Sequence, residues 1–259
     1  MTTSHQAALW TDSRPPVLRG ARPARVVTLA DMADPDRHGT ILPLVSAGHR
    51  NRRHTGVVLL RFAADAAIVA LIEPYVLHGA HLVTEPEQLG IVLEDGRVAN
   101  VWLGAAKASP PMPPQEIGAH YARLLDPVAA AAGITCQLGV RRGAHTIVDA
   151  IALRGARLQR QPAGRADLPT DWIHQMQSGT GHELPKPLRG VTAFRASATP
   201  IELLVPRGCC AGTRTPPQDA CPACPLRPDD SDRRTAAEEW ISHLAPSDLR
   251  YLIGTEVSP

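Results

Sequence analysis

The sequence predicts an α+β fold in which a small antiparallel sheet packs against several helices. Apolar residues between Val57 and Val76 recur every three or four positions, which is typical of a helix with one buried face. Residues 87–104 instead alternate around an Asp95-Gly96 pair, a pattern that favours a hairpin with a type I′ turn. Helical patterns return at 115–132 and 143–161. Together these predict one large domain with extensions.

Composition narrows the classes of protein to which the chain can belong. Hydrophobic residues make up 44 % of the 259 residues, but aromatic residues only 3 %, so the core must be built mainly from Ala, Leu, Val and Ile. The formal net charge is +2 at pH 7, which gives no reason to expect a nucleic-acid partner.

In chain order, residues 1–24 are rich in proline and arginine without periodicity, and we expect a flexible segment. Residues 25–206 form the expected α+β domain. Arg25–Ala30 fits either a short strand or the start of a helix, and the basic cluster at 49–54 fits a solvated loop or an anion contact. The helix at Val57–Val76 is expected to end at Pro74 or one turn earlier. His78 and His81 then flank Gly79 in a loop.

The second half of this domain begins with a proline-rich linker at 107–114 and a helix, Gln115–Ala132, stopped by Gly133. Cys136 lies among apolar neighbours and is interpreted as a buried packing residue. Further helices are predicted at Gly143–Gln161 and Pro169–Gln177, and strands at Gly190–Arg195 and Pro200–Val205. The arginines of the first of these two helices are expected to be mostly solvated: Arg141, Arg142, Arg154, Arg157 and Arg160.

Residues 207–226 form a cysteine-rich loop. Four of the five cysteines fall within sixteen residues, as Cys-Cys-x10-Cys-x2-Cys: Cys209, Cys210, Cys221 and Cys224. A Cys-x2-Cys pair places two thiolates on one turn, whereas adjacent cysteines in an extended chain point to opposite sides and suit a single tetrahedral ion poorly. A 2Fe-2S cluster, with two thiolates on each iron, accepts a wider spread of ligands. Structural zinc and a disulfide framework are the alternatives.

The cysteine spacing, the closing Cys-Pro-Ala-Cys-Pro-Leu and the preceding Arg207 resemble the C-terminal signature of the FhuF-type ferric siderophore reductases. The resemblance extends more weakly upstream, to about Val57. It implies a 2Fe-2S cluster on the four cysteines and one-electron reduction of siderophore-bound Fe(III). Residues 211–218 are small and polar where family members are often aromatic. The chain also continues past Leu226, and residues 227–259 are expected to add an exposed stretch to Arg234 and helices at Thr235–His243 and Ser247–Ile253.

The remaining sequence features bear on partners and localisation. No dinucleotide fingerprint, Gly-x-Ser-x-Gly or His-Glu-x-x-His motif is found, so a reductase of this kind must take electrons from a separate protein. Arg207 and Arg214 either raise the potential of an anionic cluster or simply solvate the loop. No signal segment and no membrane-spanning segment is expected, which predicts a soluble cytoplasmic protein and leaves contact with a membrane surface open.

Two other functions remain open from the sequence. The chain fits a siderophore-binding or biosynthesis-associated protein whose cysteines hold structural zinc. It equally fits a 2Fe-2S electron-transfer partner without its own siderophore site.

Overall fold

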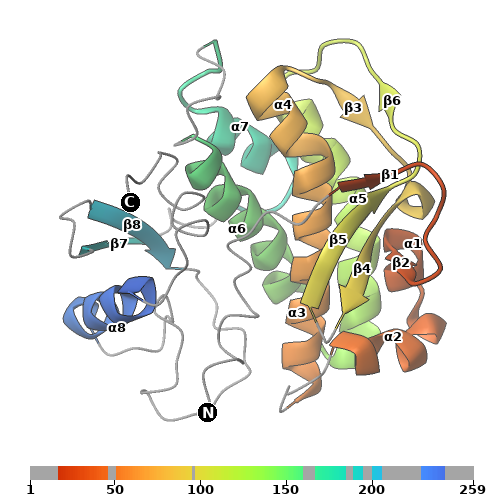
Figure 1. Ribbon diagram of the computed structural model, residues 1–259, viewed down its shortest axis with the longest axis horizontal. Helices are drawn as coiled ribbons and strands as arrows, with labels where there is room; N and C mark the ends of the chain where they lie inside the picture. The colour runs from red at the N-terminus through yellow and green to blue at the C-terminus, as the bar shows by residue number, and fades with distance from the viewer. Residues whose placement is uncertain are drawn as a thin grey trace.

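The computed structural model describes residues 17–45, 51–94, 97–159, 167–184, 189–194, 200–205 and 229–242. These residues form an α+β structure in which helices surround a small sheet, as the sequence predicted (Figure 1). The sheet is mixed and not antiparallel, because strand β1 (Val17–Arg19) pairs in parallel with β5 (Arg97–Leu103). The sequence did not reveal this strand, which lies within the segment expected to be flexible and is too short to show alternation.

The four-stranded sheet has the order β1-β5-β4-β2, where β4 is Leu89–Glu94 and β2 is Val26–Thr28. The predicted hairpin is confirmed by the antiparallel pairing of β4 with β5, from Leu89 opposite Leu103 to Glu94 opposite Arg97. Its expected turn at 95–96 lies outside the described residues. One face of this hairpin is buried against helix α3 through Leu89, Ile91, Val101 and Leu103.

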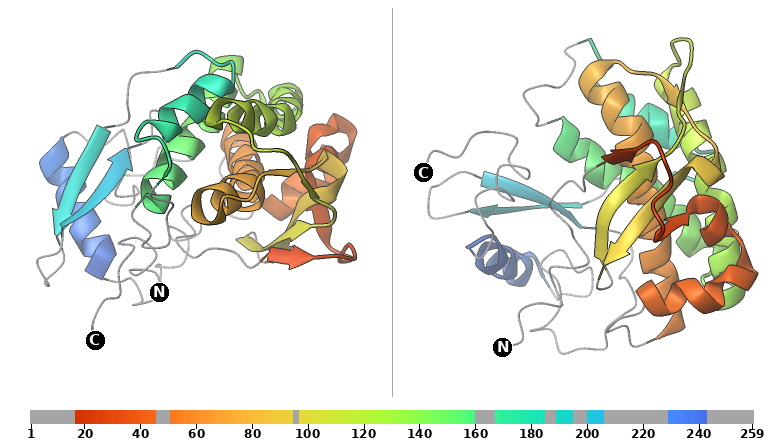
Figure 2. Two further views of the ribbon diagram at one scale, coloured as in Figure 1. Left: turned by 90° about the horizontal axis from the view of Figure 1, so that it is seen from above. Right: turned by 45° about the vertical axis from the view of Figure 1, so that its right-hand side comes forward.

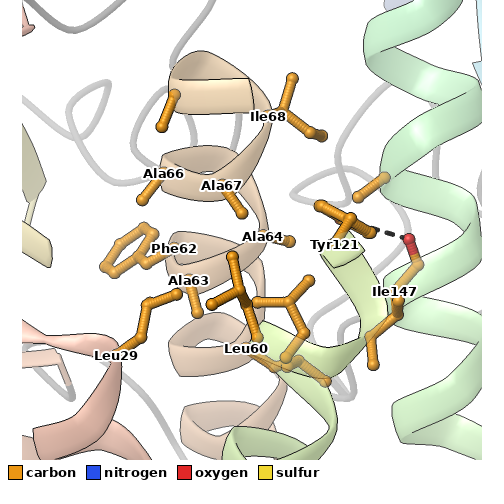
Figure 3. Close-up of a cluster of buried hydrophobic side chains, with 14 of the residues drawn as sticks. Leu29, Leu60, Phe62, Ala63, Ala64, Ala66, Ala67, Ile68, Tyr121 and Ile147 are labelled. Atoms are coloured by element: carbon orange, nitrogen blue, oxygen red, sulfur yellow. Dashed lines mark hydrogen bonds between the residues drawn. The ribbon is translucent and has the colours of Figure 1, made fainter. Parts of the chain in front are cut away.

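A single long helical rod runs through the middle of the molecule, made of α3 (Arg52–Ala67), a π-helical segment (Ile68–Ile72) and α4 (Glu73–His78) (Figure 1). The side chain of Asn51 accepts a hydrogen bond from the His54 N–H at 2.8 Å and caps the start of α3. Helix α3 therefore begins within the basic cluster that was interpreted as a loop. Small and aliphatic side chains of α3 fill the core beside Tyr121 (Figure 3).

The prediction that this helix ends at or before Pro74 was wrong, because the rod continues to His78 and ends at Gly79 in the left-handed region, with φ of 66°. A proline inside an α-helix removes one hydrogen bond and collides with a carbonyl of the preceding turn. Here the turn before Pro74 is widened, since the N–H of Glu73 donates to the carbonyl of Ile68, five residues earlier. The wider turn accommodates the ring.

Five more helices surround the rod. Helix α5 continues past Gly133, where the sequence placed its end, and stops where Gln137 adopts φ of 57° and donates its N–H to Ala132. A single glycine lowers helix stability without necessarily ending a well-packed helix. Helix α7 begins three residues later than Pro169. The bounds are α1, Leu29–Ala33; α2, His38–Val45; α5, Pro114–Cys136; α6, Val140–Leu158; and α7, Trp172–Gly179.

Short elements complete this part of the chain. Strands β3 (Leu82–Val83) and β6 (Lys107–Ala108) pair antiparallel, so the segment expected to be a linker begins as a strand. Single 3₁₀ turns lie at Pro35–Arg37 and Pro86–Gln88. The sequence allowed either a short strand or the start of a helix at Arg25–Ala30, and the structure contains both. Strand β2 leads directly into α1 through the capping residue Thr28.

A smaller unit lies to one side of the helices (Figure 2). It consists of β7 (Arg189–Phe194) and β8 (Pro200–Val205), which pair antiparallel, and of α8 (Asp230–Ser242), which packs on β7. The two predicted strands are confirmed. Helix α8 begins at Asp230, whereas the sequence predicted an exposed stretch up to Arg234. The expected helix at Ser247–Ile253 lies outside the described residues.

The rod is also relevant to the predicted absence of a membrane span. By length and composition, the helix from Arg52 to His78 is apolar enough to cross a bilayer, so the expectation that no segment meets this test was wrong. Its most apolar window is 89 % buried inside the structure. That burial is the behaviour of a core helix, and the sheet and α5 cover it (Figure 1).

Candidate functional site

The predicted site lies in a part of the chain that the structure leaves undescribed. The residues concerned are Arg207, Cys209, Cys210, Arg214, Cys221 and Cys224, which all fall between 206 and 228. Their positions relative to one another are therefore still a prediction from spacing. The elements on either side of the segment are described, and they define where it leaves and rejoins the fold.

Strand β8 precedes the cysteine segment and is held by six residue pairs to β7, from Phe194 opposite Pro200 to Arg189 opposite Val205. Helix α8 follows the segment and packs on the same strand β7 (Figure 2). Both ends of the cysteine segment are thus attached to one hairpin-and-helix unit. A site built between ordered elements that contact a common strand needs less ordering when it binds a ligand.

The start of α8 carries a negative charge close to the last cysteine in sequence. Asp229 caps the helix, because its side chain accepts a hydrogen bond from the Asp232 N–H at 2.8 Å. Arg233 is buried and its Nη1 lies 3.0 Å from Asp230 Oδ1. Carboxylates in a first turn stabilise a helix through its dipole, and this accounts for a helix that begins earlier than the apolar pattern indicated.

The fifth cysteine behaves as the sequence predicted. Cys136 at the end of α5 is a free thiol with no exposed surface. Burial raises its pKa, although the Thr135 hydroxyl and the Arg52 guanidinium act in the opposite direction. A buried, protonated thiol is a poor metal ligand and nucleophile. Among the described residues, no group of three or more His, Cys, Asp or Glu side chains is arranged to hold a metal ion.

A buried ion pair is the most prominent polar feature of the described core. Arg154 of α6 places its Nε 3.0 Å from Asp65 Oδ1 of α3, and the arginine side chain is only 7 % exposed. The expectation that Arg154 is solvated was therefore wrong. Helical spacing places Arg154 on the same buried stripe as Ile151 and Leu158, and Asp65 on the neighbouring helix supplies the carboxylate that pairs with it there.

The π-helical turn determines where the next acidic residue of the rod lies. Each α-helical residue turns the chain by about 100°, so Asp65 and Glu73 would be about 80° apart in an uninterrupted helix. A π turn takes one extra residue, which reduces this angle to about 20°. Glu73, which is 1 % exposed, thereby falls on the same side of the rod as Asp65. The sequence signal was the presence of Asp65 and Glu73 in an otherwise apolar run.

Two described histidines have structural partners. His81 Nδ1 accepts the N–H of Met112 at 3.0 Å, and its ring meets Tyr75 edge-on with centroids 5.1 Å apart. His38 bridges Met32 O and Thr135 Oγ1, and so ties α1 to the end of α5. These contacts explain both side chains through packing and hydrogen bonding, without a ligand.

No protein-family model matches the chain, and no curated protein is similar to it. The interpretation of the site therefore depends on the cysteine spacing and on the elements that bracket it.

Proposed function

We propose that the chain is a cytoplasmic ferric siderophore reductase that transfers one electron to siderophore-bound Fe(III). The observation that supports this is the Cys-Cys-x10-Cys-x2-Cys spacing at residues 209–224. Four thiolates are the ligand set that a 2Fe-2S cluster uses, so the chemistry of these donors fits the group. Each iron of such a cluster takes only two thiolates, so all four cysteines need not converge on a single ion. This suits Cys209 and Cys210, which are adjacent and bind one tetrahedral ion poorly.

Cys209, Cys210, Cys221 and Cys224 would hold the cluster, and Pro222 and Pro225 restrict the backbone around the closing pair. When bound, a 2Fe-2S cluster supplies one electron at a time, which matches the change from Fe(III) to Fe(II). The residues around such a cluster would set its reduction potential through charge and hydrogen bonds to sulfur. Arg207 and Arg214 are the nearest cations in sequence, and their charge would favour the reduced state.

The reaction is balanced by electron transfer alone. A separate donor protein is oxidised by one electron, and the iron of the siderophore complex is reduced by one electron. No covalent bond to the protein forms. Hard oxygen ligands hold Fe(II) much more weakly than Fe(III), so reduction leads to release of the metal. The protein must bring the complex close to the cysteine segment, and it need not bind the iron itself.

Anaerobic purification followed by iron and sulfide analysis, a visible spectrum and electron paramagnetic resonance after dithionite tests the cofactor. We expect equal iron and sulfide and a reduced-state signal that Cys209→Ser abolishes. Cys136→Ala is the matched control, because this cysteine is buried in the helical core and should leave the signal unchanged. The activity test adds a ferric trihydroxamate to the dithionite-reduced, desalted protein and traps Fe(II) with a coloured chelator.

The outcomes separate the three functions. Stoichiometric zinc in a colourless protein would overturn the reductase proposal and favour a zinc-stabilised binding protein. A cluster that is not reoxidised by the ferric trihydroxamate, while a redox dye reoxidises it, would favour an electron-transfer partner. Reoxidation of the cluster with equivalent appearance of chelated Fe(II) supports the reductase.

A further inference from the structure

One end of the helical core is built largely from two stretches of the chain that contain no acidic residue. The sequence stretches 37–64 and 127–148 contain arginine and histidine but no Asp or Glu. The structure brings them together: His38 Nδ1 lies 2.5 Å from Thr135 Oγ1, and a Cβ added at Gly56 would lie 2.7 Å from the Cβ of Cys136. We call this the basic end. It is formed by α2, the start of α3, the end of α5 and the start of α6 (Figure 1).

Exposed cations lie at the basic end. Arg52 and Arg53 occupy the first turn of α3, and Arg141 the first turn of α6. The Arg52 guanidinium is close enough to lower the pKa of Cys136 at the end of α5, against the larger effect of burial. Helices α3 and α6 both begin here, so the positive ends of their dipoles add to the same field.

The same end exposes apolar side chains. Three of the four large apolar side chains that are exposed in the described part of the chain lie here: Leu44 at 50 %, Ile134 at 73 % and Val140 at 92 %. Ile134 and Val140 flank the turn between α5 and α6. Leu138, in the middle of that turn, is buried at 5 % and packs against the core. The turn is thus anchored by Leu138, and its packing does not need the two exposed residues.

We propose that the basic end docks the protein onto an anionic lipid bilayer. Aliphatic side chains at a turn insert into the boundary between headgroups and acyl chains, while surrounding arginines contact lipid phosphates. Exposed aliphatic groups without aromatic ones fit a lipid surface better than a nucleic acid, whose bases stack on aromatic rings. The proposal does not depend on the reductase function, because it uses no residue of the cysteine segment.

Vesicle sedimentation of the full chain tests the surface. We expect binding to phosphatidylcholine vesicles that contain about 30 % phosphatidylglycerol, little binding to pure phosphatidylcholine, and weakening by salt. Ile134→Ser and Val140→Ser should each lower the partition coefficient about tenfold. Arg53→Gln with Arg141→Gln should lower it by a similar or larger factor, whereas Arg19→Gln with Arg25→Gln, exposed on the sheet side, should change it little.

All substituted side chains are exposed, so circular dichroism and the melting temperature should be those of the wild type. Failure of the wild type to sediment with anionic vesicles would overturn the proposal. An unchanged partition coefficient in the Ile134→Ser and Val140→Ser variants would also overturn it, since charge alone would then explain adsorption. A dimer that Val140→Ser dissociates, seen by sedimentation velocity without lipid, would identify the end as an interface between copies instead.

Discussion

Arg154 Nε lies 3.0 Å from Asp65 Oδ1, and this contact joins helices α6 and α3 across the core beside Tyr121. The two charges balance in a region where an isolated charge would be costly. The pair explains how a rod as apolar as the one from Arg52 to His78 tolerates an acidic residue near its middle.

Removing one partner of this pair should destabilise the protein strongly. Asp65→Ala leaves a 7 % exposed guanidinium without its carboxylate, and we expect a loss of about 3 kcal/mol in the free energy of unfolding. Urea denaturation followed by circular dichroism measures it. Arg22→Gln, which breaks the exposed Arg22–Asp31 pair, is the control and should cost less than about 1 kcal/mol. Equal losses in the two variants would contradict the buried pair's role.

The packing of α5 on α7 should not tolerate a methyl group at Gly118. A Cβ there would lie 1.9 Å from the carbonyl oxygen of Met176, which belongs to the backbone and cannot swing away. We expect Gly118→Ala to lower the free energy of unfolding by about 1–3 kcal/mol, measured by urea denaturation. Gly39→Ala in α2 meets nothing within 4 Å and should be neutral or slightly stabilising, because alanine favours helix. A Gly118→Ala variant with unchanged free energy of unfolding would show that α5 and α7 are further apart than this contact implies.

Tyr121 should make stability fall at alkaline pH. Burial raises the pKa of its phenol well above the usual 10.0, and the negative charge of Asp65 acts in the same direction. The folded state therefore keeps the proton where the unfolded chain loses it, so this contribution is complete below about pH 10 and declines above it. We expect the free energy of unfolding of Tyr121→Phe to fall less steeply above pH 10. Parallel pH profiles of wild type and variant would refute this.

The cations next to the cysteines should tune the proposed cluster. Arg207→Gln and Arg214→Gln each remove a positive charge near an anionic centre, which should make its reduction potential more negative by tens of millivolts. Potentiometric titration followed by electron paramagnetic resonance measures the change. Arg234→Gln, an exposed arginine on α8, is the control for general charge effects. Unchanged potentials in the first two variants would mean that both arginines only solvate the loop.

Local patterns predicted most of the elements but not their ends. The hairpin at 89–103 and the helices at α3, α5 and α6 followed from alternation and helical spacing. The helix ends predicted at Pro74 and Gly133 were wrong. The helix-breaking propensity of these residues, at most a few kcal/mol, is smaller than the free energy gained by burying a packed apolar face. β1 was missed because three residues carry no periodic signal, and its parallel pairing with β5 is a long-range contact.

The candidate ligands of the proposed cluster were identified from the sequence alone. The identity and spacing of Cys209, Cys210, Cys221 and Cys224 are covalent facts of the chain, and thiolate chemistry follows from them. The tertiary structure added that β8 and α8, on either side of the segment, both contact β7.

The sequence by itself therefore determined the α+β class, the main helices, the hairpin and the donor chemistry, since each depends on neighbouring residues. Only the tertiary structure decided that Arg154 pairs with Asp65, that the π turn brings Glu73 onto the same side of the rod, and that two acid-free stretches form one basic end. These relationships join residues far apart in the chain, and their energies depend on burial and distance, which local periodicity does not encode.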